Sequence, residues 1–274
     1  MTLKTRNSFI KFFLLASLVL LFIMLLSFIV ALTTNSLRIP PQLRIPAFLD
    51  LLPFLKNSFP AVLLSFLVLF AYIPVCFFFL IRYFENTQTS EIIFFTGFLI
   101  ACMAEASRFF AICFGLWQSF SNILIFSGKI VLFGRTRAPL SFLCSAILSE
   151  TSQRQHVERN YIIMMTVSVV FAAIIPMNTA RISSTALVTE GFMVLINILR
   201  LLLFITTIFS FFVAGVKKNS TDHKHLASSS FLILASYSVL LSCDNFVFLI
   251  LGSLGLFFGT YRHLLSIHKM YMWV

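Results

Sequence analysis

The sequence predicts an all-α fold, a polytopic bundle of membrane-spanning helices that forms a single integral membrane domain over residues 1–274. Two observations predict it. Hydrophobic residues make up 59% of the chain and charged residues 11%, whereas soluble domains are about half apolar and a quarter charged. The apolar residues are also gathered in long runs, and no segment between these runs is long enough for a soluble catalytic or signalling domain.

Seven apolar runs approach or exceed the ~20 residues that a helix needs to cross a bilayer. Six or eight spans are alternatives, because the fourth run is short and the segment Leu140–Leu148 reads as an interfacial helix or as part of a broken span. The predicted spans are Phe9–Leu32, Ala61–Tyr83, Glu91–Phe114, Phe120–Phe133, Tyr161–Met177, Val188–Val216 and Phe231–Phe258.

The first run is longer than the roughly 7–15-residue core of a signal peptide. We therefore expect it to be retained as a span, with cleavage as the alternative. The segment that follows, Thr33–Phe59, is rich in proline and predicts an ordered or interfacial loop, because proline breaks helices.

The distribution of the basic residues indicates how the chain is oriented in the membrane. The net charge is +11, but the lysines and arginines are scattered among apolar runs and form no patch interleaved with exposed aromatic residues, which argues against nucleic acid as a partner. With the N-terminus inside, the inner segments hold eleven basic residues and the outer segments six. By the positive-inside rule, the N-terminus is cytoplasmic, the C-terminus is outside, and the chain lies in the cytoplasmic membrane with lipid as its main partner.

No motif predicts a catalytic residue, a metal site or a cofactor. The five cysteines show no C-x-x-C spacing, and there is no Walker loop, G-x-S-x-G or H-E-x-x-H. A G-x-x-x-G spacing at Gly255 and Gly259 lets helices approach closely, and in a multispan protein it indicates internal packing more than dimerisation.

Charges inside the predicted spans are the candidate functional residues. A central Asp, Lys or Arg costs roughly 2.5–3.5 kcal/mol on insertion, whereas each Leu, Ile, Phe or Val returns only about 0.3–0.6 kcal/mol. The third span carries both Glu105 and Arg108, so these charges are expected to face protein or water. Their spacing of three residues allows mutual neutralisation on one helix face, which is the simplest interpretation.

A sharper hypothesis comes from depth. Counted inward from the outer ends of their spans, Glu105, Lys129, Arg200 and Asp244 fall about 15–20 Å deep, near the middle of a ~30 Å hydrocarbon layer. Asn197 and Asn245 lie beside two of them. With Arg108, this predicted charge network has two carboxylates and three cations, and the surplus positive charge suits a small anionic ligand.

These features support a ligand-binding or sensor-like membrane protein. A secondary transporter of an anionic or proton-coupled solute is the alternative, motivated by Pro74 within a span and Pro176 at the end of another. A structural or assembly role stays open, and an intramembrane enzyme acting on a lipid is the least favoured hypothesis. Signalling would need a protein partner, and the charged segment Gly134–Asn160, expected as an inner loop, is the candidate surface for it.

Overall fold

The computed structural model describes residues 2–37, 58–87, 89–116, 121–150, 157–183 and 185–272. These ranges are almost entirely helical and include one two-stranded antiparallel sheet. The elements, in chain order, are α1 (Leu3–Thr33), α2 (Phe59–Phe84), α3 (Ser90–Met103), α4 (Ala106–Cys113), α5 (Ser121–Glu150), α6 (Val157–Ile174), β1 (Met177–Ile182), β2 (Val188–Glu190), α7 (Met193–Lys217), α8 (Thr221–Leu241) and α9 (Phe246–Met272).

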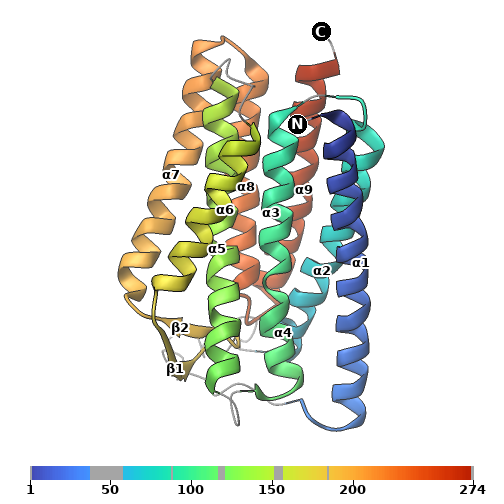
Figure 1. Cartoon of the computed structure of the whole chain (residues 1–274), viewed down its shortest axis with the longest axis vertical. Coiled ribbons are helices and arrows are strands. Elements are labelled where there is room, and N and C mark those ends of the chain that lie inside the picture. The colour runs from blue at the N-terminus through green and yellow to red at the C-terminus, as the bar shows by residue number, and fades with distance from the viewer. Residues whose placement is uncertain are drawn as a thin grey trace.

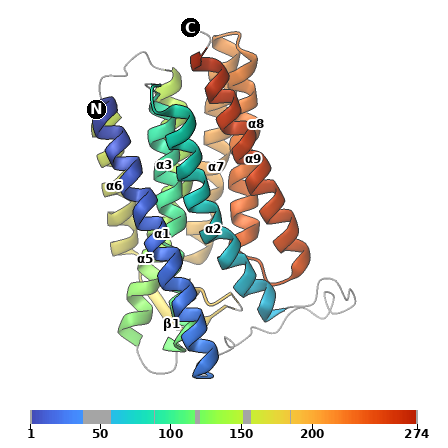
Figure 2. The same cartoon turned by 90° about the vertical axis from the view of Figure 1, so that its right-hand side faces the viewer.

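The helices form one bundle of long rods (Figures 1 and 2). Because α3 and α4 follow each other along one rod, eight segments of the described chain are long and apolar enough to cross a membrane. The predicted all-α membrane bundle is confirmed, with one span more than the central expectation of seven. The helices α1, α6 and α7 expose large apolar side chains along most of their length, as lipid-facing helices do.

The predicted last span, Phe231–Phe258, is two helices. A tight turn, Ser242–Asn245, divides the predicted apolar run. At this turn α8 ends and α9 begins in the opposite direction. The Asn245 side chain accepts a hydrogen bond of 2.9 Å from the backbone N–H of Phe248, which caps the start of α9. The polar pair Asp244–Asn245 therefore marks a helix boundary, and the sequence interpretation placed it wrongly inside a span.

The glycines of α9 explain how close the two helices lie. A Cβ added at Gly255 would come 2.1 Å from Ser236 Oγ, and one at Gly259 would come 3.0 Å from a side-chain carbon of Ile233. Both neighbours are on α8, so the G-x-x-x-G spacing serves internal packing, as expected.

The predicted fourth span is also different. It continues past Phe133 as one long helix, α5, which includes GRTRAP and the segment Leu140–Leu148. Pro139 lies inside this helix and lacks an N–H, so the carbonyl of Arg135 loses its usual partner in the next turn. The expected inner loop Gly134–Asn160 is thus largely helical: α5 runs to Glu150 and α6 starts at Val157.

A β-hairpin closes the end of the bundle between α6 and α7. Strand β1 pairs with β2, with Met177 opposite Glu190, so the span expected from Val188 begins as a strand and becomes helical at Met193. Thr185 and Ala186, in the connection between the strands, are buried in the bundle. The hairpin therefore covers the interior at this end, which we call the hairpin end.

Both chain termini lie at the opposite end, which we call the terminal end (Figure 1). Eight candidate spans in the described residues agree with this placement and differ from the seven on which the expected C-out arrangement depended. Arg262 and Lys269 of α9 join Lys4 and Lys217 in the half of the bundle nearer this end. The basic residues still favour a cytoplasmic terminal end, and that orientation stays a prediction. The predicted proline-rich loop lies mostly outside the described residues.

Candidate functional site

Glu105 lies where the third rod of the bundle is interrupted. The backbone N–H groups of Ala104 and Glu105 each donate to the carbonyl three residues earlier, at 3.2 Å, and those of Ser107 and Arg108 do the same at 3.4 and 3.1 Å. This is the tighter 3₁₀ pattern, which separates α3 from α4 and often marks a functional or strained point in a helix. The break sets the Glu105 carboxylate inside the bundle, where the side chain is 0% exposed.

Two guanidinium groups neutralise the Glu105 carboxylate. Arg108 Nη1 lies 2.6 Å from Oε2, and Arg135 Nε of α5 lies 3.1 Å from Oε1. Each carboxylate oxygen thus accepts a charge-assisted hydrogen bond from a different helix. The predicted pair is present, but it has a third member that the sequence interpretation did not include. We call Glu105, Arg108 and Arg135 the buried triad.

The remaining donors of Arg108 are also occupied. Its Nε and Nη2 donate to the backbone carbonyl of Thr185 in the hairpin connection, and Nη2 also lies 3.3 Å from the carbonyl of Leu241 at the end of α8. The guanidinium carbon is 5.0 Å from the centre of the Phe66 ring on α2. Arg108 therefore joins α4, the hairpin, α8 and α2, and its hydrogen bonds are those of a structural residue.

A close contact between helices brings Arg135 to Glu105. A Cβ added at Gly134 would lie 2.6 Å from the carbonyl oxygen of Ala101 and 2.8 Å from Cβ of Ala104, so only glycine fits where α5 meets the break. Arg137, two residues further on, points to α6, where it donates to the Tyr161 hydroxyl. Both arginines lie within the bundle, and Arg137 is 0% exposed. They do not lie on an exposed charged loop as expected for Gly134–Asn160, and a protein partner at this segment stays a prediction.

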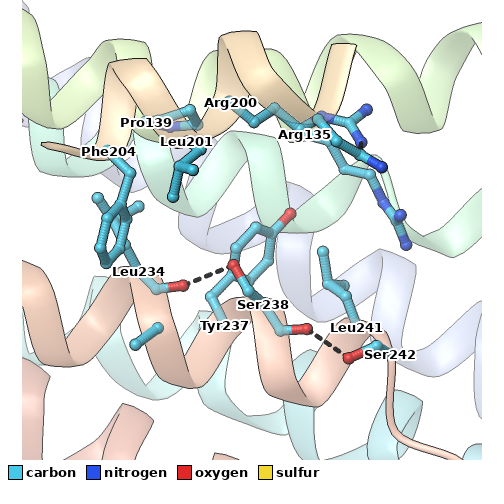
Figure 3. Close-up of a pocket in the computed structure, with 12 residues that line it drawn as sticks. Arg135, Pro139, Arg200, Leu201, Phe204, Leu234, Tyr237, Ser238, Leu241 and Ser242 are labelled. Carbon is cyan, nitrogen blue, oxygen red and sulfur yellow. Dashed lines mark hydrogen bonds between the residues drawn. The ribbon is translucent and has the colours of Figure 1, made fainter. Parts of the chain in front are cut away.

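A pocket of about 380 Å³ lies beside the triad, between α5, α7 and α8 (Figure 3). We call it the anion pocket because two arginines, Arg135 and Arg200, line it. Figure 3 shows both guanidinium groups, those of Arg135 and Arg200, at the same end as Ser242, and Phe204 and Leu234 at the other end. Its lining residues are Arg135, Pro139, Asn197, Arg200, Leu201, Phe204, Leu234, Ala235, Tyr237, Ser238, Leu241 and Ser242.

The polar groups of the anion pocket are only partly satisfied. Arg200 Nη2 pairs with Glu190 of β2 at 2.6 Å, and its Nη1 lies 3.5 Å from the Asn197 side chain. Within the described residues, however, the buried Nε of Arg200 and the buried hydroxyl of Tyr237 have no hydrogen-bond partner. Tyr237 is 3% exposed, and its ring packs edge-on against Phe98. Two residues that line the pocket therefore each keep a covered donor without an acceptor, and such groups are uncommon in folded proteins.

The predicted network is only partly assembled. Glu105 and Arg108 meet, as do Asn197 and Arg200, and Arg200 shares the pocket with Arg135. The other predicted members serve helix ends: Lys129 Nζ donates at 2.8 Å to the carbonyl of Ala173 in the last turn of α6, while Asp244 and Asn245 form the α8–α9 turn. Lys129, Asp244 and Asn245 are therefore not shown to join the site.

The site carries a surplus positive charge, as predicted, but the residues that contribute to it differ from the predicted ones. Three arginines, Arg108, Arg135 and Arg200, face two glutamates, Glu105 and Glu190, which leaves one positive charge. Arg135 and Glu190 were missed because both were assigned to the ends of spans or to loops. Tyr237 gave no sequence signal, since a tyrosine in an apolar run looks like any aromatic core residue.

Comparison of the chain with family models, with curated proteins and with solved structures finds no match. The chain is a multi-pass membrane protein, and the geometry of its site is the observation that bears on its function.

Proposed function

We propose that this membrane protein binds a small anionic ligand in the anion pocket, as a receptor or sensor. The observation that carries the proposal is a pair of unsatisfied donors, the Tyr237 hydroxyl and Arg200 Nε, on two residues that line the pocket together with Arg135. Leaving a buried donor without a partner costs about 1–3 kcal/mol. An anion with two or more oxygen acceptors would satisfy both donors and the surplus positive charge together.

Thermal unfolding of the purified protein in detergent tests this proposal. We expect inorganic phosphate or a small carboxylate to raise the unfolding temperature in a saturable way, because a ligand that binds only the folded state stabilises it. Chloride at equal ionic strength is the control for screening.

Two conservative variants report on the site itself. Tyr237→Phe removes one unsatisfied donor, and Arg200→Lys keeps the charge that faces Glu190 while removing the planar guanidinium. Both should fold and lose most of the stabilisation by the anion. The matched control, Arg82→Gln, changes an exposed arginine in the last turn of α2 and should respond as the wild type. If the anion stabilised the wild type and all three variants equally, or stabilised none of them, the result would contradict the proposal and favour a structural role.

A transporter is the second candidate, and a specific observation favours it. The 3₁₀ break at Glu105 interrupts the third rod of the bundle, and Pro139 removes one backbone hydrogen bond from the neighbouring helix α5. Interrupted helices line the substrate sites of many secondary transporters. Uptake of the stabilising anion into proteoliposomes, lost in Tyr237→Phe and Arg200→Lys but kept in Arg82→Gln, would support transport. Binding without flux would argue against transport and favour the receptor.

A further inference from the structure

The anion pocket is polar at one end and apolar at the other, and the two ends differ in membrane depth. Ser242 lies at the α8–α9 turn, and Arg200 lies about 11 Å along α7 from its start at the hairpin end. Phe204 lies about 17 Å along the same helix, and Leu234 lies about 11 Å back from the end of α8. Ser242 and Arg200 are therefore nearer the membrane surface than Phe204, and Leu234 lies at about the depth of Arg200.

This order matches a lipid in the leaflet at the hairpin end. The headgroup of such a lipid lies at the surface and its chain points toward the bilayer centre. Basic pockets between membrane helices, near one surface, are a known way to hold anionic headgroups. A free ion in water needs only the polar end, so the apolar lining formed by Leu201, Phe204 and Leu234 calls for a second explanation.

The pocket also opens through the wall of the bundle. Leu201 is 57% exposed and Ser238 is exposed, although both line the pocket. They lie on α7 and α8 at depths that a membrane would cover, and the neighbouring residues Leu202 and Ile205 of α7 are exposed apolar side chains. An entrance at this level faces lipid chains.

We infer that the ligand of the anion pocket is an amphiphile with an anionic, phosphate-type or carboxylate-type headgroup and an apolar chain, which enters sideways from the membrane between α7 and α8. The headgroup would meet Arg135, Arg200 and Tyr237, and the chain would lie along Leu201 and Phe204. This inference rests on the proposed anion site and names its ligand class.

Fluorescence quenching in phosphatidylcholine vesicles tests the inference. Trp117 and Trp273 are replaced by Phe, and Phe204→Trp places a single reporter in the pocket. A minor fraction of phosphatidic acid with brominated chains is then added. Because each charge-assisted hydrogen bond contributes about 1.5–3 kcal/mol, we expect the brominated lipid to be enriched at the reporter by about tenfold or more over its share of the bilayer. Leu201→Trp is a second reporter, in case Phe204→Trp does not fold.

Three controls make the result specific. Brominated phosphatidylcholine should quench only in proportion to its share. A reporter on the lipid-facing side of α7, Phe209→Trp, which is exposed, should show no enrichment for either lipid. The double change Tyr237→Phe with Arg200→Lys, made in the Phe204→Trp background, should abolish the excess quenching.

Every other outcome overturns the amphiphile, the anion site or both. Proportional quenching by the anionic lipid, combined with stabilisation by inorganic phosphate, means that the site is filled from water; the amphiphile is then wrong and the proposed anion site stands. Equal excess quenching by both lipids means an apolar groove that does not recognise charge, and neither claim stands. No excess quenching and no stabilisation by any anion overturns both.

Discussion

The buried triad and the anion pocket share Arg135 but differ in how their polar groups are satisfied. In the triad, both oxygens of Glu105 and all of the Arg108 nitrogens have partners, supplied by four parts of the chain. In the pocket, Tyr237 and Arg200 keep donors that no described residue accepts. A satisfied buried network stabilises one arrangement of helices, whereas unsatisfied donors beside a cavity are available to a ligand. The difference favours a structural role for the triad and supports the binding that we propose for its neighbour.

The largest expected effect breaks the triad. Glu105→Gln leaves the Arg108 and Arg135 side chains without their shared carboxylate in the bundle interior, and breaking a buried ion pair this way costs about 3–5 kcal/mol. The unfolding temperature in detergent should fall strongly. Glu85→Gln, which breaks an exposed pair with Lys11 at 3.4 Å, should change stability by less than about 1 kcal/mol. If the two variants behaved alike, the triad would not be structural.

The next-largest expected effect comes from displacing α5, the helix whose Arg135 belongs to both regions. Gly134→Ala adds a Cβ that would lie 2.6 Å from a backbone oxygen of α3, which has no freedom to move aside. Overpacking of this kind costs about 1–3 kcal/mol, and it should also pull Arg135 away from Glu105. Gly128→Ala on the same helix meets the flexible Met177 side chain and Cβ of Val188, both at 3.3 Å, and should cost less in a denaturation measurement. The reverse order would show that the α3–α5 contact is not tight.

A pair of tyrosines sharpens the comparison. The hydroxyl of Tyr72 on α2 is 2.6 Å from Oγ1 of Thr260 and both are buried, so Tyr72→Phe leaves a partner unsatisfied and should cost about 1–3 kcal/mol. Tyr237→Phe removes a donor that already lacks a partner, so without ligand its stability should be unchanged or higher. Calorimetry of the two variants measures the difference. A destabilised Tyr237→Phe would mean that its hydroxyl is satisfied in the protein.

The smallest expected effect is a pH dependence of stability that arises at the α8–α9 turn. Burial raises the pKa of the Asp244 carboxyl, in the α8–α9 turn, above its ordinary value. A carboxyl whose folded pKa is raised destabilises the fold when ionised, so this cost is absent below the unfolded pKa of about 3.9 and is complete above the raised one. Asp244→Asn should therefore gain stability over the wild type as the pH rises through that window. The Asp244 side chain is only partly buried, so water screens its charge and limits the gain to under about 1 kcal/mol. A constant difference across the pH range would contradict the shift.

Much of the fold follows from the sequence alone. Long apolar runs determine the all-α membrane bundle, because a spanning segment must satisfy its own backbone hydrogen bonds. The cost of charge in lipid likewise singled out Glu105, Arg108 and Arg200 as inward-facing residues. Helix boundaries were harder: α5 and the α8–α9 turn were misjudged, since a charged stretch inside a bundle and a polar helix cap inside an apolar run contradict the hydropathy pattern.

Only the tertiary structure decided which charges meet. Glu105 and Arg135 are thirty positions apart, and their contact depends on Gly134 letting α5 approach the break in the third rod. The Thr185 carbonyl reaches Arg108 because a hairpin folds back under the bundle, and Tyr237 faces a pocket that three helices enclose. Hydropathy is a property of each segment and is readable along the chain, whereas a buried network and a cavity depend on the distances between segments, which only packing determines.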